Sequence, residues 1–257
     1  MVFVYHLGFG LDDLPTPPPT LALLSGDPDR AAHIGTTRLE QSRLLSEKRG
    51  LTSYVGFLGD SAVLSCTSGM GGPSASIVFN ELAQLGIRTV VRIGTCGSIQ
   101  AHVPPGAIVI SSASLCRHGS ANDIAPVEFP AAADPFLTVA LADAARTLGV
   151  DYFVGVTASV DTFFEGQERS ASSANPHLLR SLRNQTDEFR SLRILNYEME
   201  SGTLFKAGLV YGVAVGCVCA VVAQRTVGEQ VQLETKDGAV DRAIDVAVAT
   251  ARTWLAR

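Results

Sequence analysis

Polar side chains that could bind a ligand or take part in a reaction follow several apolar runs of this sequence. The run DYFVGV, residues 151–156, leads into DTFFEGQERSA, where Gln167 and Arg169 stand one residue apart. A carboxamide both donates and accepts hydrogen bonds, whereas a guanidinium only donates. The pair therefore offers a mixed hydrogen-bonding edge to a ligand. Other junctions carry further polar residues: Gly26, Asp27, Arg30, Arg92, Thr95, and Glu198 and Glu200 on either side of Met199.

Neither an arginine inside an apolar strand nor a glycine-rich loop is enough by itself to identify the function. An arginine inside an apolar strand, such as Arg92 in VVRIGT, often pairs with a carboxylate for structural reasons. The loop GMGGPS, residues 69–74, can hold an anion through backbone N–H groups, but its spacing matches neither GxGxxG nor GxxxxGK[ST].

Strand and helix patterns alternate, which predicts a parallel sheet with helices packed on it. The last apolar run, VAVGCVCAVV, does not alternate between apolar and polar residues, which suits a central strand covered on both faces. The expected strands are TLALLS (20–25), AVLSCTS (62–68), TVVRIGTCGSI (89–99, with a glycine turn at its end), AIVISSAS (107–114), DYFVGVTAS (151–159) and VAVGCVCAVV (213–222).

Helix signals lie between these runs. Asp27 before Pro28 is typical of a helix N-cap followed by a first-turn proline. Pro73 opens a helix that Gly86 ends, and its apolar positions recur at helical spacing. Those positions are Ile77, Leu82 and Leu85, and the other expected helices are 135–149, 200–212 from Glu200, and 238–255. In an open α/β sheet, ligands bind beyond the carboxyl ends of the strands, so the polar residues above should converge there.

Composition narrows the possible function. The chain has 257 residues, of which 46% are hydrophobic and 18% charged. This composition favours a single domain, residues 1–257, with one large core and with surface buried between subunits. A net charge of -5 gives no electrostatic reason to expect nucleic acid or anionic membrane. Five cysteines without a CxxC pair suggest buried thiols rather than a zinc site. With no signal-like start and no apolar run of ~18 residues, we expect a cytoplasmic protein.

Several segments together resemble the nucleoside phosphorylase superfamily, and within it the uridine phosphorylase branch. They are YHLG, GDPDR, GMGGPSASI, ELAQLGIRTVVRIGTCGSIQ, VEFPA, VGVTASVDTFFEGQER, NYEMES and VVAQRT, in family order along nearly the whole chain. The resemblance implies one three-layer α/β/α domain with a mixed central β-sheet. It also implies a hexamer built as a trimer of dimers, and the conversion of uridine and phosphate to uracil and ribose 1-phosphate.

The resemblance also implies roles for individual residues, with Arg169, Gln167 and Arg92 as the catalytic set. Three guanidiniums can surround a phosphate dianion with bidentate hydrogen bonds. The phosphate residues are Gly26, Arg30, Arg92 and Thr95, with Arg49 reaching in from the neighbouring subunit. The ribose residues are Thr95, Glu198, Met199 and Glu200, with His6 reaching across a dimer interface. The base residues are Gly97, Phe163, Gln167, Arg169, Val222 and Ala223.

Hydrogen bonding then selects the base. The O2 and N3–H of uracil would meet the amide of Gln167, and O4 would accept from Arg169, with Phe163 stacked on the ring. Cytosine would leave both side chains mispaired, at ~1–3 kcal/mol per buried unsatisfied group. Arg169 would also stabilise negative charge on the departing base.

Departures from the family leave alternatives open. Purine-directed relatives have an aspartate after the late strand, whereas VVAQRT (221–226) has no carboxylate, so a purine nucleoside phosphorylase is disfavoured. A nucleoside hydrolase and a non-catalytic nucleoside-binding relative are the other candidates. Arg225 either supports Arg169 or makes a structural salt bridge, and Cys96 is not expected to act as a nucleophile. Gly50 replaces the glutamate with which some relatives bind an interface cation, so we expect no metal, with phosphate as co-substrate and no cofactor.

Overall fold

A nine-stranded mixed β-sheet forms the centre of the computed structural model, which describes residues 2–226, 228, 230 and 233–257. The strand order is β10-β9-β8-β11-β7-β3-β6-β5-β4. The strands of this sheet are β3 (Leu21–Ser25), β4 (Glu40–Ser46), β5 (Ser53–Leu58), β6 (Ser61–Thr67), β7 (Thr89–Ser98), β8 (Ile108–Arg117), β9 (Tyr152–Val160), β10 (Asn196–Glu198) and β11 (Ala214–Gln224). A separate hairpin joins β1 (Phe3–Val4) to β2 (Phe9–Gly10).

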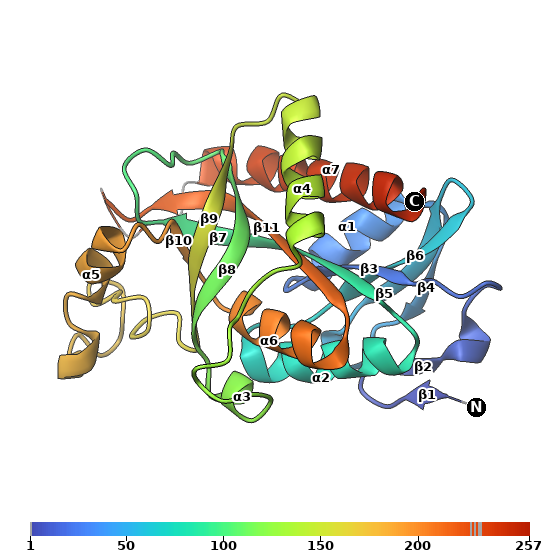
Figure 1. Cartoon of the computed structure of the whole chain (residues 1–257), viewed down its shortest axis with the longest axis horizontal. Helices are drawn as coiled ribbons and strands as arrows, with labels where there is room; N and C mark the ends of the chain where they lie inside the picture. Colours follow the sequence, from blue (N-terminus) through green and yellow to red (C-terminus); the bar gives the residue numbers. More distant parts are fainter. Residues whose placement is uncertain (1, 227, 229, 231–232) are drawn as a thin grey trace.

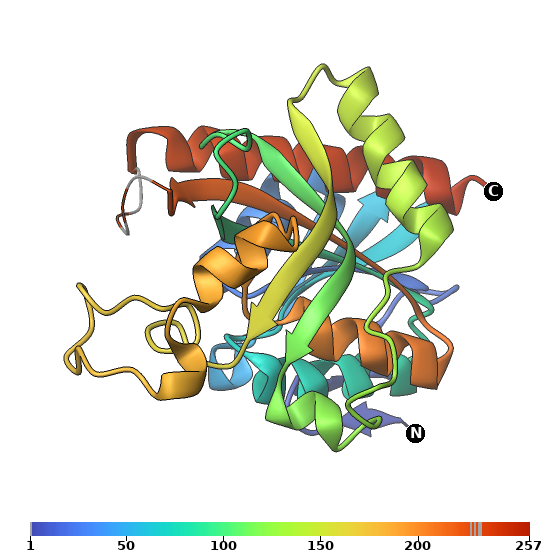
Figure 2. The same cartoon turned by 60° about the vertical axis from the view of Figure 1, so that its left-hand side comes forward.

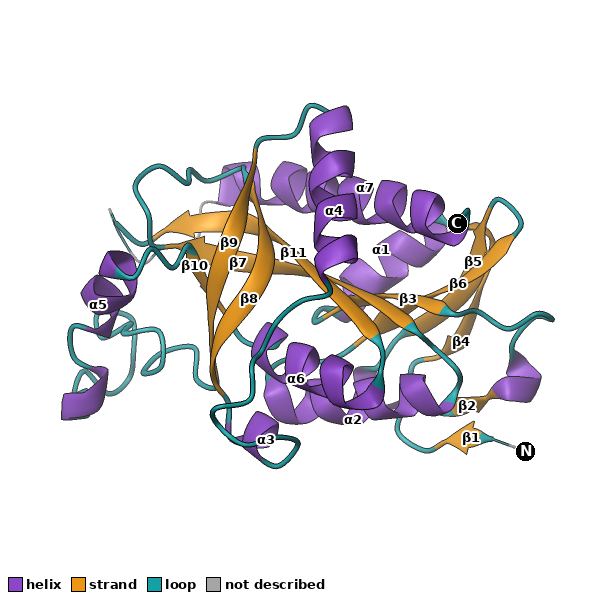
Figure 3. Ribbon diagram, in the orientation of Figure 1, coloured by secondary structure: helices purple, strands orange, loops and turns teal. Residues whose placement is uncertain are grey.

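Helices cover both faces of the sheet, giving three layers (Figures 1 and 3). On one face lie α1 (Pro28–Arg38), α4 (Pro135–Thr147) and α7 (Leu233–Leu255), and on the other α2 (Gly72–Gln84), α3 (Gly119–Asn122) and α6 (Ser201–Tyr211). The helix α5 (Gln185–Ser191) lies beside β9 and β10, at the end of the molecule that comes forward in Figure 2. Short 3-10 turns occur at Leu11–Asp13, Lys48–Gly50 and Arg180–Leu182.

The side-chain alternation of β3 shows why its sequence is continuously apolar. Leu21 and Leu23 join the core under α1, α4 and α7, whereas Ala22 and Leu24 join the core under α2 and α6. Successive side chains of a strand point to opposite faces, so a strand covered on both sides needs apolar residues throughout. The same reasoning holds for β11, which lies between β8 and β7 and is buried from Val215 to Ala223.

One end of the sheet closes on itself. The short strand β10 pairs parallel with β9 and antiparallel with β7, so β7, β11, β8, β9 and β10 form a ring. Its register sets Glu198 beside Ser159 and Tyr197 beside Gly97. Closure therefore brings the end of β10, with its carboxylate, against the carboxyl ends of β7 and β9.

Most of the expected elements are confirmed, and the predicted α1 cap is present, because Asp27 accepts a hydrogen bond from the backbone of Asp29 at 3.0 Å. Ile77 was wrongly assigned to the buried face of α2. It is 41% exposed, because the helix turns Ala75, Val78, Phe79 and Leu82 inward instead.

Several predicted boundaries were also wrong. The predicted glycine turn after the third strand is absent, because β7 continues through Gly94 and Gly97 to Ser98. Helix α6 starts at Ser201, one residue after the predicted Glu200, and α7 starts at Leu233 rather than Gly238. Cys116 is half-buried, although the other four cysteines are buried as expected. None of the described helices combines the length and apolar character needed to cross a membrane.

Candidate active site

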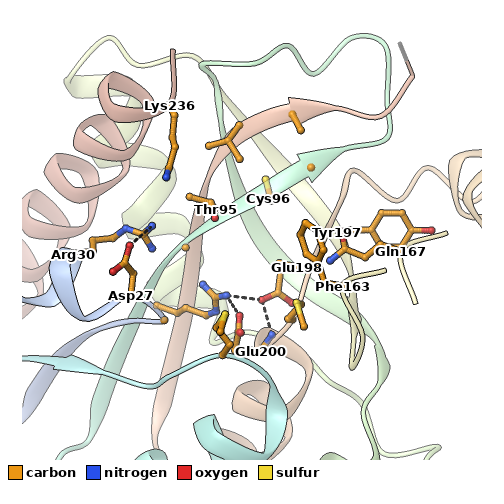
Figure 4. A pocket seen from close by; sticks show the side chains of 18 of the residues that line it. Asp27, Arg30, Thr95, Cys96, Phe163, Gln167, Tyr197, Glu198, Glu200 and Lys236 are labelled. Atoms are coloured by element: carbon orange, nitrogen blue, oxygen red, sulfur yellow. Dashed lines mark hydrogen bonds and ion pairs between the residues drawn. The ribbon is translucent and has the colours of Figure 1, made fainter. Parts of the chain in front are cut away.

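A pocket of about 490 Å³ opens where the carboxyl ends of β3, β7 and β11 meet the β10–α6 junction and the turn after β9 (Figure 4). All the predicted site residues except His6 and Arg49 line it: Gly26, Arg30, Arg92, Thr95, Gly97, Phe163, Gln167, Arg169, Glu198, Met199, Glu200, Val222 and Ala223. Segments nearly two hundred residues apart in the chain thus contribute to one cavity.

Arginines occupy the end of the pocket formed by β3 and β7. Arg30 projects from the first turn of α1, and its Nη1 donates to the carbonyl oxygen of Ile93 at 3.2 Å. Burial lowers the pKa of the Arg30 guanidinium, with Asp27 acting in the opposite direction. Arg92 is 4% exposed and contacts a carboxylate oxygen of Glu200, while its Nη2 lies 3.1 Å from Glu198 Oε2. Burial alone would lower the pKa of Arg92, but Glu200 and Glu198 raise it well above its usual value.

Two carboxylates are fixed at the middle of the pocket. Glu198 accepts hydrogen bonds from the backbone of Glu200 at 2.9 Å and from the Ser201 hydroxyl at 2.5 Å. Burial alone would raise the pKa of Glu198, but Arg92 and the hydroxyls of Ser159 and Ser201 hold it below the usual carboxyl range. Glu200 accepts from the backbone N–H of Gly71 at 2.6 Å. Glu198 is therefore held ionised, with Arg92, Glu200 and Ser201 already donating to its carboxylate.

The turn 167–169 forms the opposite end. Gln167 and Arg169 are only 3% and 4% exposed, and Arg169 Nε donates to Gln167 Oε1 at 3.2 Å. This contact fixes the amide, because its oxygen must face the guanidinium. Arg225 donates to the backbone oxygens of Gln167 at 2.8 Å and Glu168 at 3.3 Å. Arg225 therefore supports the turn that carries Arg169.

Glu168, the middle residue of the turn, has a strained backbone and a hydrogen-bonded carboxylate. Glu168 has a φ of 53°, in the left-handed region that side chains seldom adopt. Its carboxylate accepts from the backbone of Thr186 at 2.9 Å, at the start of α5. The helix and Arg225 together hold a conformation that a free loop would avoid.

Flat and apolar groups surround the same end of the pocket. Phe163 is 41% exposed, and the Arg169 guanidinium lies 4.2 Å from the centre of its ring. A side chain at Gly97 would come within 3.3 Å of Arg225 and 3.5 Å of Arg169, so glycine permits the close approach of both arginines. Val222 and Ala223 add apolar surface. The arrangement suits a planar heterocycle with hydrogen-bonding groups on one edge.

His6 and Arg49 lie outside this pocket, and both lie beside Tyr5. The Arg49 guanidinium is 5.7 Å from the centre of the Tyr5 ring, and the His6 ring is 5.1 Å from the same ring. Glu81 orients His6, accepting from its backbone N–H at 2.8 Å and contacting Nδ1 at 2.7 Å. One chain alone therefore does not bring these two residues to the other predicted site residues.

The pocket is also lined by residues that were not among the predicted site residues. Tyr197 and Cys96 lie within the motifs NYEMES and GTCGS, and Met70 lies in the glycine loop. Lys236 descends from α7 on the side of Arg30 (Figure 4), two residues before the predicted start of that helix. Burial, together with the neighbouring Cys219, raises the pKa of the Cys96 thiol well above its usual value. A protonated thiol is a poor nucleophile.

Within the described part of the chain, no group of three or more His, Cys, Asp or Glu side chains has an arrangement able to hold a metal ion. The arrangement of the pocket residues suits an anion at one end, hydroxyl groups in the middle and a planar ring at the other end.

Comparisons with known proteins agree with this arrangement. A family model described as the phosphorylase superfamily matches residues 20–256. The chain belongs to the phosphorylase superfamily. It is 40% identical to the uridine phosphorylase of Escherichia coli K12 over 252 residues, covering 98% of each chain. It is 37% identical to that of Haemophilus influenzae Rd, covering 92% of this chain and 93% of the relative. It is 36% identical to that of Thermococcus kodakarensis, covering 85% and 78%.

Proposed function

We propose that this phosphorylase superfamily member is a uridine phosphorylase, which converts uridine and inorganic phosphate reversibly to uracil and ribose 1-phosphate. One observation carries the proposal: a buried amide and guanidinium, Gln167 and Arg169, face the pocket at one end while Arg30 and Arg92 lie at the other. Between them stand the carboxylates of Glu198 and Glu200. This is the order of base, sugar and phosphate in the reacting complex.

Base recognition follows from the fixed amide. Because Gln167 Oε1 faces Arg169, the same oxygen can accept N3–H of uracil and the amide nitrogen can donate to O2. The Arg169 guanidinium then donates to O4. Cytosine reverses the donor and acceptor at positions 3 and 4, so it would leave buried groups unpaired, at ~1–3 kcal/mol each.

The same guanidinium serves the chemical step. As the glycosidic bond stretches, the sugar becomes oxocarbenium-like and the base gains negative charge on its carbonyl oxygens. Arg169 is already in place and buried, so it stabilises this charge without reorganisation. Phosphate held by Arg30, Arg92 and Thr95 attacks the anomeric carbon from the opposite face, and positioning supplies much of the remaining acceleration. No covalent enzyme intermediate, cofactor or metal is required in this scheme.

The ribose hydroxyls are assigned to the middle of the pocket. Glu200 accepts from two of them and Glu198 assists at the 2-hydroxyl, with Met199 packed on the ring. The carboxylate of Glu198 is held ionised by Arg92 and two serine hydroxyls, which supports its role as an acceptor.

Completion of the site requires a second subunit in this proposal. His6 and Arg49 lie outside the pocket and both lie beside Tyr5, which supports their delivery from one surface of a neighbouring chain in a dimer. Three such dimers would form a hexamer. A mixing experiment tests this. Arg169→Ala and Arg49→Ala chains should each be nearly inactive, and refolding them together should restore activity in mixed dimers. No restoration would exclude shared sites, and an active monomer in light scattering would do the same.

Uracil release from uridine, measured with and without phosphate, tests the activity itself. Phosphate-dependent release is expected. Release without phosphate would indicate a nucleoside hydrolase, and absence of release would indicate a non-catalytic nucleoside-binding protein. A purine substrate is disfavoured because Val222 and Ala223, not a carboxylate, line the base end of the pocket.

A further inference from the structure

A buried glutamine on α5 contacts the segment that carries the turn 167–169, and the mechanism above does not use it. Gln185 is the first residue of α5, is 2% exposed and does not line the pocket. Its Nε2 donates to the carbonyl oxygen of Gly166 at 2.8 Å and lies 3.5 Å from that of Glu165. Its Oε1 accepts from Arg117 Nη1 at 3.0 Å. Both ends of the buried amide therefore have partners, as a buried polar group requires.

These partners allow the amide of Gln185 only one orientation. A guanidinium only donates and a carbonyl oxygen only accepts, so Oε1 must face Arg117 and Nε2 must face Gly166. Arg117 is the last residue of β8, and its guanidinium also lies 4.8 Å from the centre of the Phe189 ring on α5. The amide of Gln185 thus connects the end of β8 to the segment that follows β9.

The hydrogen bond to Gly166 acts directly on Gln167, because one peptide group joins the two residues. That group is planar, so holding its oxygen also holds the Gln167 nitrogen. On the other side, the carbonyl oxygen of Gln167 accepts from Arg225 Nη1 at 2.8 Å. The two peptide planes that meet at the Gln167 Cα atom are thus held by different elements. Fixing both planes fixes the direction in which the Gln167 side chain leaves the backbone.

The segment around Gly166 is tight, so a displacement there would reach Arg169 as well. The backbone N–H of Arg169 donates to the carbonyl oxygen of Phe164 at 2.7 Å, which closes the turn on itself. A side chain at Gly166 would come within 2.8 Å of the carbonyl oxygen of Thr162. Little free space is therefore left to absorb a movement of Gly166 before it is passed along the chain.

We propose that Gln185 is a positioning residue for base recognition, which holds the peptide between Gly166 and Gln167 so that Gln167 and Arg169 meet the edge of uracil. The proposal rests on the proposed function, in which that edge faces the turn 167–169. Hydrogen bonds weaken steeply when their angles are poor, so a small rotation of the turn weakens both contacts. Uracil is then recognised partly through a residue that does not touch it.

Two substitutions remove the hydrogen bond to Gly166 without shortening the side chain. Gln185→Met has no N–H donor, and the carboxylate of Gln185→Glu can still accept from Arg117 but cannot donate to Gly166. We expect both to lower kcat/KM for uridine by about tenfold, because a misplacement of 1 Å can cost about 10²-fold. The loss should come chiefly from a higher uridine KM, with the phosphate KM within about twofold of the wild-type value. A smaller amount of folded enzyme would instead lower kcat and change neither KM.

A double variant and a matched control make the test specific. In the Gln167→Ala background, Gln185→Met should lower kcat/KM for uridine by less than about threefold, because the amide that it positions is absent. Gln100→Met is the matched control. Gln100 Nε2 also donates to backbone oxygens, those of Arg190 at 3.0 Å and Ile194 at 2.9 Å, towards the other end of the same helix. This variant should keep the uridine KM within about twofold of the wild-type value.

Calorimetric titration of the same proteins with uracil, in the presence of phosphate, separates this role from the proposed function. An unchanged uridine KM and uracil affinity in Gln185→Met, or a full tenfold loss in the Gln167→Ala background, would show a merely structural glutamine and overturn the proposal. If Gln185→Met does not fold, Gln185→Glu decides the matter by the same measurements. A wild-type chain that binds uracil but releases none from uridine would refute the proposed activity, and the uracil affinities would still decide the role of Gln185. A wild-type chain that neither binds nor releases uracil would refute both.

Discussion

Replacing Gln167 by alanine should weaken uridine turnover strongly while leaving phosphate binding nearly unchanged. The side chain is buried, and its oxygen is held by Arg169 Nε at 3.2 Å. Its removal leaves two edge groups of uracil, O2 and N3–H, without partners. Two unsatisfied groups at ~1–3 kcal/mol each give about 2–6 kcal/mol. Water entering the vacated space should recover part of this, so we expect about 3 kcal/mol, or roughly 10²-fold in kcat/KM.

The assay is steady-state release of uracil, with uridine and phosphate varied in turn. The phosphate KM should stay within about twofold of the wild-type value, because Gln167 and the arginines Arg30 and Arg92 line opposite ends of the pocket. Discrimination against cytidine should shrink as well, since the alanine variant no longer mispairs with it. Uridine turnover within about threefold of wild type, or an equal loss in phosphate affinity, would refute the assigned base orientation.

A second glutamine variant controls for stability. Gln100 donates to the backbone oxygens of Arg190 at 3.0 Å and Ile194 at 2.9 Å, outside the pocket. Gln100→Ala should lower the midpoint of thermal unfolding but leave the ratio of uridine to cytidine turnover as in the wild type. The comparison separates loss of recognition from loss of folding.

Three further predictions concern Arg92 and its neighbours. Arg92→Lys should raise the phosphate KM by about 10²-fold, because an ammonium lacks the planar fork; an increase below about threefold in initial-rate kinetics would contradict the phosphate role. In Gly94→Ala the added methyl would lie 1.9 Å from Arg92 Nη1, so the buried guanidinium must shift; we expect a higher phosphate KM and a lower unfolding midpoint, and an unchanged KM would argue against this. Because folding lowers the pKa of Glu198, its ionisation stabilises the fold at pH values above the usual carboxyl pKa of 4.5. This stabilisation is lost as the pH falls through the lower pKa of the folded state. The midpoint of thermal unfolding should therefore decrease as the wild-type protein is acidified through that range, and should depend less on pH in Glu198→Gln. Parallel plots of midpoint against pH for the two proteins would refute the linkage.

The pocket could be predicted largely from the sequence because its residues follow apolar strands at recognisable motifs. Glu198 ends β10 and Gln167 lies in the segment that follows β9, and the carboxyl ends of these strands meet at one edge of the sheet. Arg92 lies inside β7, beside Leu24 at the end of β3, and was identified by its motif. Lys236 carried no such signal, since it lies outside the motifs and before the predicted helix.

The errors in the fold have similar physical causes. The strand β4, with sequence EQSRLLS, is mostly exposed and therefore lacks the apolar pattern of a buried strand. The three residues of β10 are too few to show any periodicity. Leu82 and Leu85 do face the core, together with Ala75 and Val78, but Ile77 is 41% exposed. Ile77 stands five residues before Leu82, a spacing that does not keep two side chains on one face of a helix.

The contact between Arg92 and Glu200 places one guanidinium between two tasks, since the same group is assigned to the oxyanion and also neutralises a sugar-binding carboxylate. When an oxyanion draws Arg92 toward itself, Glu200 gains acceptor capacity for hydroxyl groups. Binding of either substrate should consequently tighten binding of the other, and thermodynamic reciprocity makes the two factors equal. A cooperative ternary complex would then be built into a single ion pair, without any movement of the surrounding sheet.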